Sequence, residues 1–152
     1  MNYIGVKLVK AVPMTVKEFN DNYRPLYYSG ECQDGYLVTY EDGYESWSPK
    51  DVFEKAYKQN KGLTFGLAVE AAKNGFKISR EGWNGKGMFV VYQKGYPQGI
   101  SCNEQTAKAW GLNPGDLFKC EPYLQIKMVN GSHSMWVPSI NDVLSEDWGI
   151  VE

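Results

Sequence analysis

Residues that bind metals or drive nucleophilic catalysis are scarce in this sequence. The one histidine is His133. The three cysteines share no Cys-x-x-Cys spacing and are Cys32, Cys102 and Cys120. Zinc sites draw on clustered Cys and His ligands, and an activated nucleophile needs an adjacent base. We therefore expect no metal site and no cofactor, with reduced and mostly buried thiols.

Long hydrophobic runs and an excess of positive charge are also absent. The apolar runs are a handful of residues long, against the ~20 residues of a bilayer-spanning helix, and Met1 is not followed by a basic and then apolar leader. Sixteen Lys and Arg stand against eighteen Asp and Glu, for a net charge of -2. We expect a cytoplasmic protein that binds neither membranes nor nucleic acids, because a broad contact with DNA or RNA needs a basic surface.

Aromatic residues and glycine are plentiful. Aromatics make up 14% of the 152 residues, and there are 16 glycines. This combination is common where flat ligands stack on rings beside a close-fitting backbone. The alternative, a small β-rich protein that fills its core with rings, is the commoner reason for any single aromatic residue.

The periodicity of the apolar residues predicts an α+β protein of two small modules. These are residues 1–60 and 63–152, each a short antiparallel sheet with one or two covering helices. The boundary is placed at residues 59–62, which are polar, end in Gly62 and lie between two helical patterns.

The first module is predicted to have the order β-α-β-β-α. An alternating strand covers residues 3–9 and ends before Pro13. Thr15 and Glu18 form a capping box, so a helix begins there and stops before Pro25.

A hairpin and a second helix complete this module. Asp42-Gly43 predicts a type I′ turn, whose positive φ angles this dipeptide tolerates. The strands flanking the turn are residues 35–40 and 44–47. Ser48-Pro49 predicts an N-cap and the first residue of a helix that runs to about residue 57. The residues on the helix face that would cover the sheet are Val52, Phe53 and Ala56.

In the second module, a helix capped by Thr64 is predicted to end near Gly75. Ser101 with Glu104 forms a capping box for a helix that ends at Trp110. The predicted turns are Asn113–Asp116 and Asn130-Gly131, and a last helical turn covers residues 139–144. The predicted strands are residues 76–79, 88–92, 123–129, 134–137 and, at an edge, 147–151.

A glycine-rich loop, residues 82–87, is the first candidate binding element. Its glycines would let backbone N–H groups approach an anion, Lys86 adds a positive charge, and Trp83 offers a face for a base. It is not a Walker loop, because no GxxxxGK spacing precedes it. Nor is it a Rossmann fingerprint, because it leads into a strand. An ordinary hairpin turn is an equally good interpretation.

The second candidate lies where a strand turns into a helix after Trp136. Pro138 fixes the exit of the strand, and Ser139 caps the helix. The free N–H groups of that helix offer a seat for phosphate or hydroxyl oxygens. A capped helix with a core tryptophan is about even with this interpretation.

A sugar-cleaving enzyme is the catalytic alternative. A glycosidase needs two carboxylates across a cleft, and Asp142, Glu146 and Asp147 are acidic neighbours. Helix capping or a solvated surface explains these side chains more simply. Because no pattern for acyl transfer, phosphoryl transfer or metal-assisted hydrolysis is present, we expect a protein without catalytic residues.

The second module resembles a known family. The resemblance rests on Leu63-Thr64-Phe65-Gly66, Arg80-Glu81-Gly82-Trp83-Asn84-Gly85-Lys86-Gly87-Met88-Phe89, Trp136-Val137-Pro138-Ser139, Asp142-Val143-Leu144 and Glu146-Asp147-Trp148. Over residues 63–152 the chain is similar to the Thoeris anti-defence 2 family, for which Trp-Asn-Gly-Lys-Gly-Met with a terminal Asp-Trp is fairly specific. Residues 1–58 resemble a small module that is common in phage proteins.

The resemblance implies a phage anti-defence protein of the host cytoplasm that sequesters a cyclic nucleotide immune signal without cleaving it. The signal bound by the family is glycocyclic ADP-ribose, and some members also take up cyclic dinucleotides. Members are homo-oligomers, typically tetramers, with ligand pockets between subunits. The ligand-binding residues that the resemblance implies are Trp83, Asn84, Gly85, Met88, Trp136, Pro138, Ser139 and Asp142.

The resemblance also implies individual roles. Trp83 would stack on the adenine or wall the pocket, with polar contacts from Asn84 and the glycine that follows it. Ser139 would reach phosphate or ribose, and Asp142 would contact a ribose hydroxyl or its own helix end. Residues 95–120 are longer and more irregular than in short relatives and would reshape the pocket. The alternative function is a phage virion or replication accessory protein that acts through protein–protein contacts.

Overall fold

The structure is a computed structural model that describes residues 1, 6–26 and 33–151. The chain divides into two compact units, an N-terminal unit of Met1–Asn60 and a C-terminal unit of Lys61–Glu152. Both combine antiparallel sheets with short helices, so the expected α+β class is confirmed. No helix in the described ranges is both long enough and apolar enough to cross a bilayer.

The N-terminal unit is a three-stranded antiparallel sheet with one helix against each face. The strands, in the order β1-β2-β3, are β1 (Lys10–Pro13), β2 (Gly35–Thr39) and β3 (Glu45–Pro49), and the helices are α1 (Val16–Asn22) and α2 (Lys50–Ala56). Leu37 of β2 is buried with Val16 and Phe19 of α1. The ring of Tyr36 stacks on Phe53 of α2, with the ring centroids 4.5 Å apart. Since successive strand residues point to opposite faces, the two helices cover opposite sides of β2.

The first strand lies later than the sequence predicted. Residues 6–9 form no strand, and residues 2–5 lie outside the described ranges. Instead, β1 pairs with β2 from Lys10, opposite Thr39, to Pro13. Because β2 ends at Thr39, residues before Lys10 have no partner strand. Pro13 is tolerated because β1 is an edge strand.

The β2–β3 hairpin turns through one residue of positive φ rather than two. Gly43 has a φ of 81°, and among the described residues only glycines have a positive φ. Asp42 therefore lacks the positive φ that a type I′ turn needs, and the predicted type I′ turn at Asp42-Gly43 is wrong. The Gly43 N–H donates to the carbonyl oxygen of Tyr40, whose own N–H donates to the carbonyl oxygen of Tyr44. This is a type I turn closed by a glycine bulge. Gly131, with a φ of 85°, closes a second hairpin in the same way.

The predicted start of α1 is confirmed and that of α2 is not. Thr15 and Glu18 form the expected capping box. Ser48 belongs to β3, and Pro49 is the N-cap of α2, with no side-chain hydrogen bond. The β2–β3 pairing extends to Pro49 opposite Gly35. Ser48, which the sequence pattern predicted as the helix N-cap, is therefore a residue of β3.

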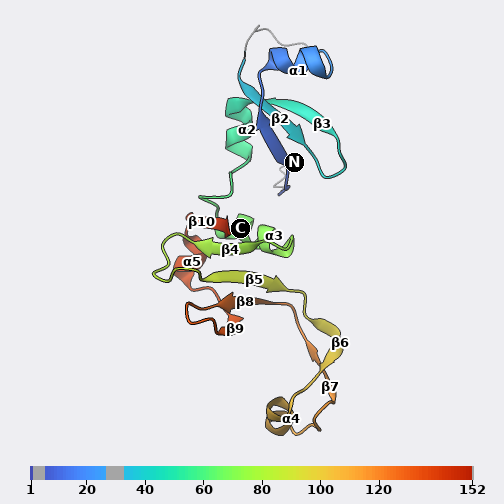
Figure 1. Ribbon diagram of the computed structural model, residues 1–152, viewed down its shortest axis with the longest axis vertical. Coiled ribbons are helices and arrows are strands. Elements are labelled where there is room, and N and C mark those ends of the chain that lie inside the picture. The colour runs from blue at the N-terminus through green and yellow to red at the C-terminus, as the bar shows by residue number, and fades with distance from the viewer. Residues whose placement is uncertain (2–5, 27–32, 152) are drawn as a thin grey trace. The chain divides into compact units, whose positions relative to one another are not determined.

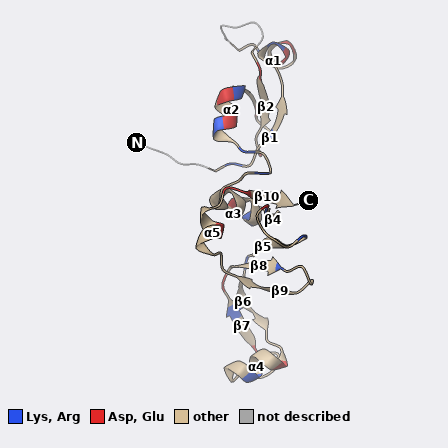
Figure 2. Ribbon diagram, turned by 90° about the vertical axis from the view of Figure 1, so that its left-hand side faces the viewer, with Lys and Arg blue, Asp and Glu red and all other residues tan. Residues whose placement is uncertain are grey.

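Most of the α2 face that was predicted to cover the sheet is exposed. Val52 and Ala56 are exposed, and Phe53 is the half-buried member of the three. The remaining surface of α2 mixes both signs of charge, as Figure 2 shows. Those charged residues are Lys50, Asp51, Glu54 and Lys55. The prediction was wrong for Val52 and Ala56. Phe53 stacks on Tyr36 of β2 and also on Tyr57, which directly follows α2.

The C-terminal unit is built on a five-stranded antiparallel sheet with the order β10-β4-β5-β8-β9, against which α3 packs (Figure 1). The strands are β4 (Lys77–Arg80), β5 (Phe89–Gln93), β8 (Tyr123–Lys127), β9 (His133–Trp136) and β10 (Trp148–Val151), and the helices are α3 (Phe65–Lys73) and α5 (Ile140–Leu144). The core joins Ala68 and Ala72 of α3 to Ile78, Val90 and Trp148 of the sheet. The last strand lies at an edge, as predicted.

The two ends of this unit meet in the sheet. Leu63 forms a bridge with Trp148. The N–H of Leu63 donates to the carbonyl oxygen of Trp148 at 2.9 Å, and the N–H of Trp148 donates back at 3.2 Å. Thr64 then caps α3 as predicted, so the helix begins directly beside the last strand.

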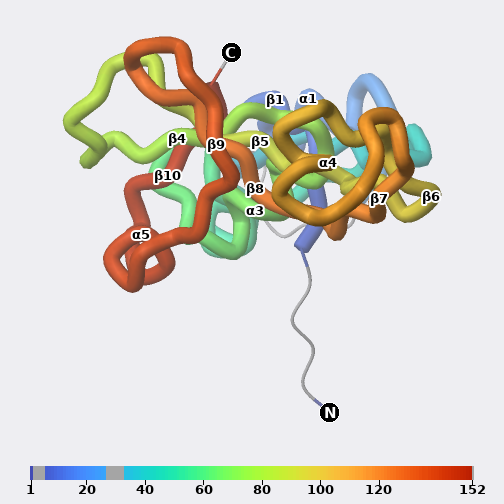
Figure 3. The backbone as a smooth tube through the Cα atoms, turned by 90° about the horizontal axis from the view of Figure 1, so that it is seen from below, coloured from blue at the N-terminus to red at the C-terminus, as the bar shows by residue number. Residues whose placement is uncertain are grey.

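Residues 95–120, which looked irregular in sequence, form an ordered arm. The arm consists of β6 (Tyr96–Ser101), α4 (Glu104–Trp110) and β7 (Leu117–Cys120). The two strands pair, and α4 lies at the far end of their ribbon (Figure 1). In the view from below, α4 lies in front of the rest of the C-terminal unit (Figure 3). A register shift between Tyr96 and Ile100 breaks the alternation that would have revealed β6. The predicted cap Ser101 is wrong, because Ser101 ends β6 and Asn103 caps α4.

Candidate functional site

Three tryptophans from separate parts of the C-terminal unit form one cluster. Trp83 lies in the loop after β4, Trp136 ends β9 and Trp148 begins β10. The ring centroids of Trp83 lie 5.4 Å from Trp148 and 5.8 Å from Trp136, and the last two lie 6.0 Å apart, all edge to face. Trp148 is fully buried, whereas Trp83 and Trp136 are half-buried. The two predicted binding loops therefore meet on a third, structural indole.

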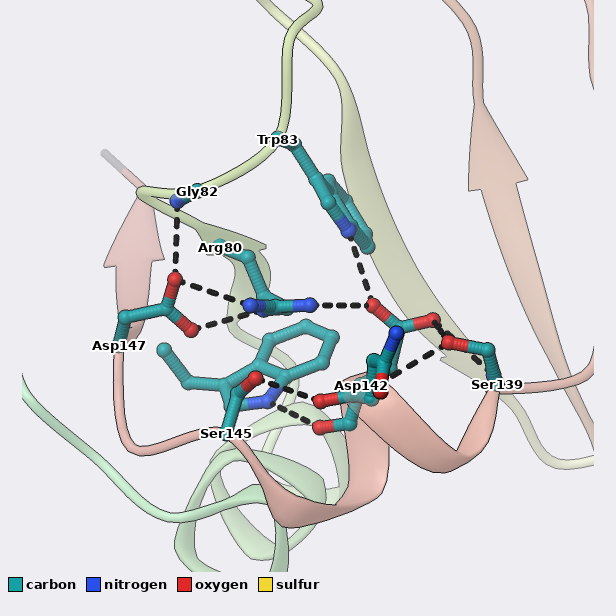
Figure 4. Close-up of polar contacts among 9 residues, drawn as sticks. Arg80, Gly82, Trp83, Ser139, Asp142, Ser145 and Asp147 are labelled. Carbon is teal, nitrogen blue, oxygen red and sulfur yellow. Dashed lines mark hydrogen bonds and ion pairs between the residues drawn. The ribbon is translucent and has the colours of Figure 1, made fainter.

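Arg80 lies beside this cluster and joins three segments of the chain (Figure 4). Its Nε donates to Oδ1 of Asp147 at 2.7 Å, and its Nη2 donates to Oδ2 at 3.1 Å. Its Nη1 donates to Oδ1 of Asp142 at 2.8 Å. The side chains of Arg80 and Asp142 are 15% and 12% exposed. The planar guanidinium thus ties the end of β4 to α5 and to the residue before β10.

The carboxylate of Asp142 accepts four hydrogen bonds. Oδ1 accepts from Arg80 and, at 3.1 Å, from the indole Nε1 of Trp83. Oδ2 accepts from the backbone N–H of Ser139 at 3.0 Å and from its Oγ at 2.7 Å, which completes a capping box at α5. An ionised carboxylate has about four acceptor positions, so both oxygens of Asp142 are saturated.

Asp147 attaches the start of the glycine-rich loop to the same arginine. Its Oδ2 accepts the backbone N–H of Gly82 at 2.9 Å. A Cβ at Gly82 would lie 2.7 Å from that oxygen, so this close approach needs glycine. The indole Nε1 of Trp148 donates to the carbonyl oxygen of Asp142 at 2.9 Å. Loop, helix and edge strand are therefore held together by one connected network.

These contacts keep both aspartates ionised. Burial raises the pKa of Asp142, but hydrogen bonds from Ser139, Arg80 and Trp83 outweigh it and hold that pKa at about 2, below its ordinary 3.8. The hydrogen bonds from Arg80 likewise lower the pKa of Asp147. A glycosidase needs one carboxylic acid that stays protonated near neutral pH. Neither aspartate suits that role, because Arg80 favours the ionised form of both carboxylates.

The other predicted residues lie around the cluster. Asn84 is exposed, and Pro138 is half-buried. Met88 packs against the core. A Cβ at Gly85 would lie 2.3 Å from Sδ of Met88 and 2.5 Å from Cγ2 of Val129. The loop therefore folds back onto the start of β5 and the β8–β9 turn.

Three polar groups of the two predicted binding loops are unpaired. Among the described residues, the indole N–H of Trp136, the side-chain amide of Asn84 and the ammonium of Lys86 have no hydrogen-bond or ion-pair partner. His133 is exposed at the start of β9. Within the described ranges, no group of three His, Cys, Asp or Glu side chains is placed to hold a metal ion.

The sequence reasoning gave Arg80 and Trp148 no role. One signal was available for Arg80, because Ile78 is buried and residue 80 shares its face of β4. An arginine that points toward a core needs carboxylate partners. The positions of those partners depend on the fold, because Asp142 and Asp147 lie 62 and 67 residues away in sequence.

Comparisons with known proteins agree on the span that holds this site. Residues 63–151 match the family model described as Tad2-like, a Thoeris anti-defense 2-like domain. A protein of Bacillus phage SP01 named Thoeris anti-defense 2 is 36% identical over 93 residues, which is 59% of this chain and 94% of that relative. The family match includes the three clustered tryptophans, Arg80 and both aspartates. It does not include the N-terminal unit.

Proposed function

Since this chain belongs to the Thoeris anti-defense 2-like family and is a phage anti-defence protein, we propose that its C-terminal unit sequesters a cyclic nucleotide immune signal. Glycocyclic ADP-ribose is the proposed ligand, with cyclic dinucleotides as further ligands. The protein holds the signal in the host cytoplasm and releases it chemically intact, so it is a binding protein and not an enzyme.

The observation that carries this proposal is the pair of half-buried indoles, Trp83 and Trp136, which lie against each other on two loops that also carry unpaired donors. An adenine ring can stack on an indole face whatever hydrogen bonds its edges make. The indole N–H of Trp136, the amide of Asn84 and the ammonium of Lys86 are available for phosphate and ribose oxygens. In this proposal Gly85 and Met88 contribute to the ligand site from the glycine-rich loop, and the Pro138–Asp142 turn contributes to it from the start of α5.

Tight binding without turnover is consistent with the chemistry of the site. A sub-micromolar complex needs roughly 8 kcal/mol or more of binding free energy. Two stacked rings at about 1–3 kcal/mol each, with a few charge-assisted hydrogen bonds, approach that value. Both site carboxylates are engaged by Arg80, and a carboxylate held in that way is a poor general base.

Calorimetry on the full chain tests this function. We expect one ligand site for glycocyclic ADP-ribose and recovery of the intact nucleotide after heat denaturation. Trp83→Ala should weaken the affinity by about tenfold or more, the loss expected for one stacked base. Tyr44→Ala is the control, because Tyr44 is an aromatic residue of the N-terminal unit and is 51% exposed. A cleaved product, or equal losses in the two variants, would contradict the proposal.

We also propose that copies of this chain assemble, as a tetramer, so that a neighbouring copy completes the ligand pocket. β9 is an edge strand of the five-stranded sheet, and an open edge tends to pair with another chain. Beside it lie several exposed apolar side chains of β9, α5 and the turn between them. They are Met135 (67% exposed), Val137 (85%), Ile140 (69%) and Leu144 (73%).

A single charge on this surface should disrupt the assembly. Val137→Asp is expected to reduce the mass measured by light scattering to that of a smaller species, because a charge inside an apolar contact stays unpaired. Val52→Asp, on the exposed face of α2, is the control and should leave the mass unchanged. A wild-type chain that is monomeric at micromolar concentration would rule out the assembly.

A further inference from the structure

Arg80 controls the acceptor that holds the Trp83 ring. The two side chains meet at Oδ1 of Asp142, which lies 2.8 Å from Nη1 of Arg80 and 3.1 Å from Nε1 of Trp83. Figure 4 shows the carboxylate between the guanidinium and the indole. A shift of this carboxylate would therefore move the hydrogen-bond acceptor of the Trp83 ring.

Both carboxylates that Arg80 binds are also fixed from another side. Oδ2 of Asp142 is held by the backbone N–H and the hydroxyl of Ser139. Oδ2 of Asp147 accepts from Gly82, one residue before Trp83. The guanidinium thus orients two anchors of the loop, one for its backbone and one for its ring.

The ring of Trp83 is positioned by a hydrogen bond as well as by packing. The ring is half-buried, and it meets Trp136 and Trp148 edge to face. A torsion between an sp³ and an sp² carbon has a broad, roughly two-fold preference. A flipped indole would carry its Nε1 away from Asp142 and lose this hydrogen bond. The hydrogen bond to Oδ1 selects one orientation.

We propose that Arg80 is a positioning residue that acts through Asp142 to set the ring of Trp83, and that Asp142 supports the pocket without contacting the ligand. The proposal rests on the proposed function, in which Trp83 faces the nucleotide. The saturated oxygens of Asp142 favour this supporting role, because a ribose hydroxyl could bind only by displacing one of the four existing donors.

Arg80→Lys in the full chain tests the proposal. Lysine keeps the positive charge but offers one ammonium in place of a planar fork, so it cannot hold both carboxylates in the same geometry. In the ligand-free protein, the indole N–H resonance of Trp83 should shift or broaden in a ¹H–¹⁵N spectrum. The affinity for glycocyclic ADP-ribose should fall by about tenfold, measured on protein that circular dichroism shows to be folded.

Arg24→Lys is the matched control. Arg24 is exposed in the N-terminal unit and donates to the hydroxyl of Tyr44, so its replacement should leave both the Trp83 resonance and the affinity unchanged. A double-mutant comparison tests the route through Trp83. In a Trp83→Phe background, which has no indole N–H, Arg80→Lys should lower the affinity by less than about threefold.

Two results would overturn the positioning role. The first is a folded Arg80→Lys variant with an unmoved Trp83 resonance and wild-type affinity, and the second is an undiminished tenfold loss in the Trp83→Phe background. A wild-type chain that binds none of the nucleotides would contradict the proposed function, while the ligand-free spectrum would still decide the positioning role.

Ser139→Ala provides a second route in case Arg80→Lys does not fold. This variant frees Oδ2 of Asp142 from the serine hydroxyl and removes no charge. It should displace the Trp83 resonance and weaken binding by about threefold. An unmoved resonance with unchanged affinity would count against the proposal.

Discussion

Trp148→Ala is expected to lower the free energy of unfolding of the C-terminal unit by about 3–5 kcal/mol. The side chain is fully buried, and its ring contacts those of Trp83, Trp136 and Phe65. Truncation leaves a cavity among three rings and removes the donor to the carbonyl oxygen of Asp142. Because domains are stable by only about 5–15 kcal/mol, the variant should retain little stability. Urea unfolding followed by circular dichroism measures this change.

Two further variants separate ring packing from the hydrogen bond of Trp148. Trp148→Phe keeps a buried ring and loses the indole N–H, so a smaller cost of about 1–3 kcal/mol is expected. Trp110→Ala removes a tryptophan that is 70% exposed, and it should cost about 1 kcal/mol or less. If Trp148→Ala were as mild as Trp110→Ala, the buried indole would not be the centre of this core.

Acid is expected to destabilise the C-terminal unit through the same network. The pKa of Asp142 is about 2 in the folded protein, against an ordinary value of 3.8. A carboxyl group whose pKa is lowered on folding stabilises the folded protein at pH values above its unfolded pKa. This contribution is lost as the pH falls from about 4 toward 2. For Asp142 the loss is about 2 kcal/mol. Asp147, whose pKa is also lowered, adds a loss of the same sign.

Urea unfolding between pH 6 and pH 2 measures this effect. Asp142→Asn should be less stable than the wild type at pH 6 and should lose less stability on acidification. Asp21→Asn breaks an exposed pair with Lys17 and should leave the pH dependence of the wild type unchanged. If Asp142→Asn lost as much stability between pH 6 and pH 2 as the wild type does, a group other than Asp142 would be responsible for the acid sensitivity.

Elements with local signals were predicted well from sequence. The capping patterns at Thr15, Thr64 and Ser139 fix helix starts, because a side-chain oxygen must accept an N–H within three residues. Alternation, apolar runs and turn residues likewise located the five strands of the larger sheet to within about two residues. Both signals are complete within a short stretch of chain, so no knowledge of the fold is needed to use them.

Apart from the turn type at Asp42-Gly43, the errors occurred where a partner distant in sequence decides the structure. The first strand was misplaced because its position depends on where β2 ends. Ser48 and Ser101 have good cap chemistry, but strand pairing includes both of them. For the candidate site, the sequence pointed to Trp83 and Trp136. It gave no indication that Arg80 joins their loops, because the carboxylates come from distant segments.

The bridge between Leu63 and Trp148 holds the first and last segments of the C-terminal unit side by side. Its chain enters and leaves at adjacent positions of one sheet, so a further module can be attached there without separating the strands that support the tryptophans. The same adjacency permits circular permutation, with residues 151 and 63 joined by a short linker and new termini opened in the Asn113–Asp116 turn. A different N-terminal module can therefore precede this domain without a change in the indole cluster.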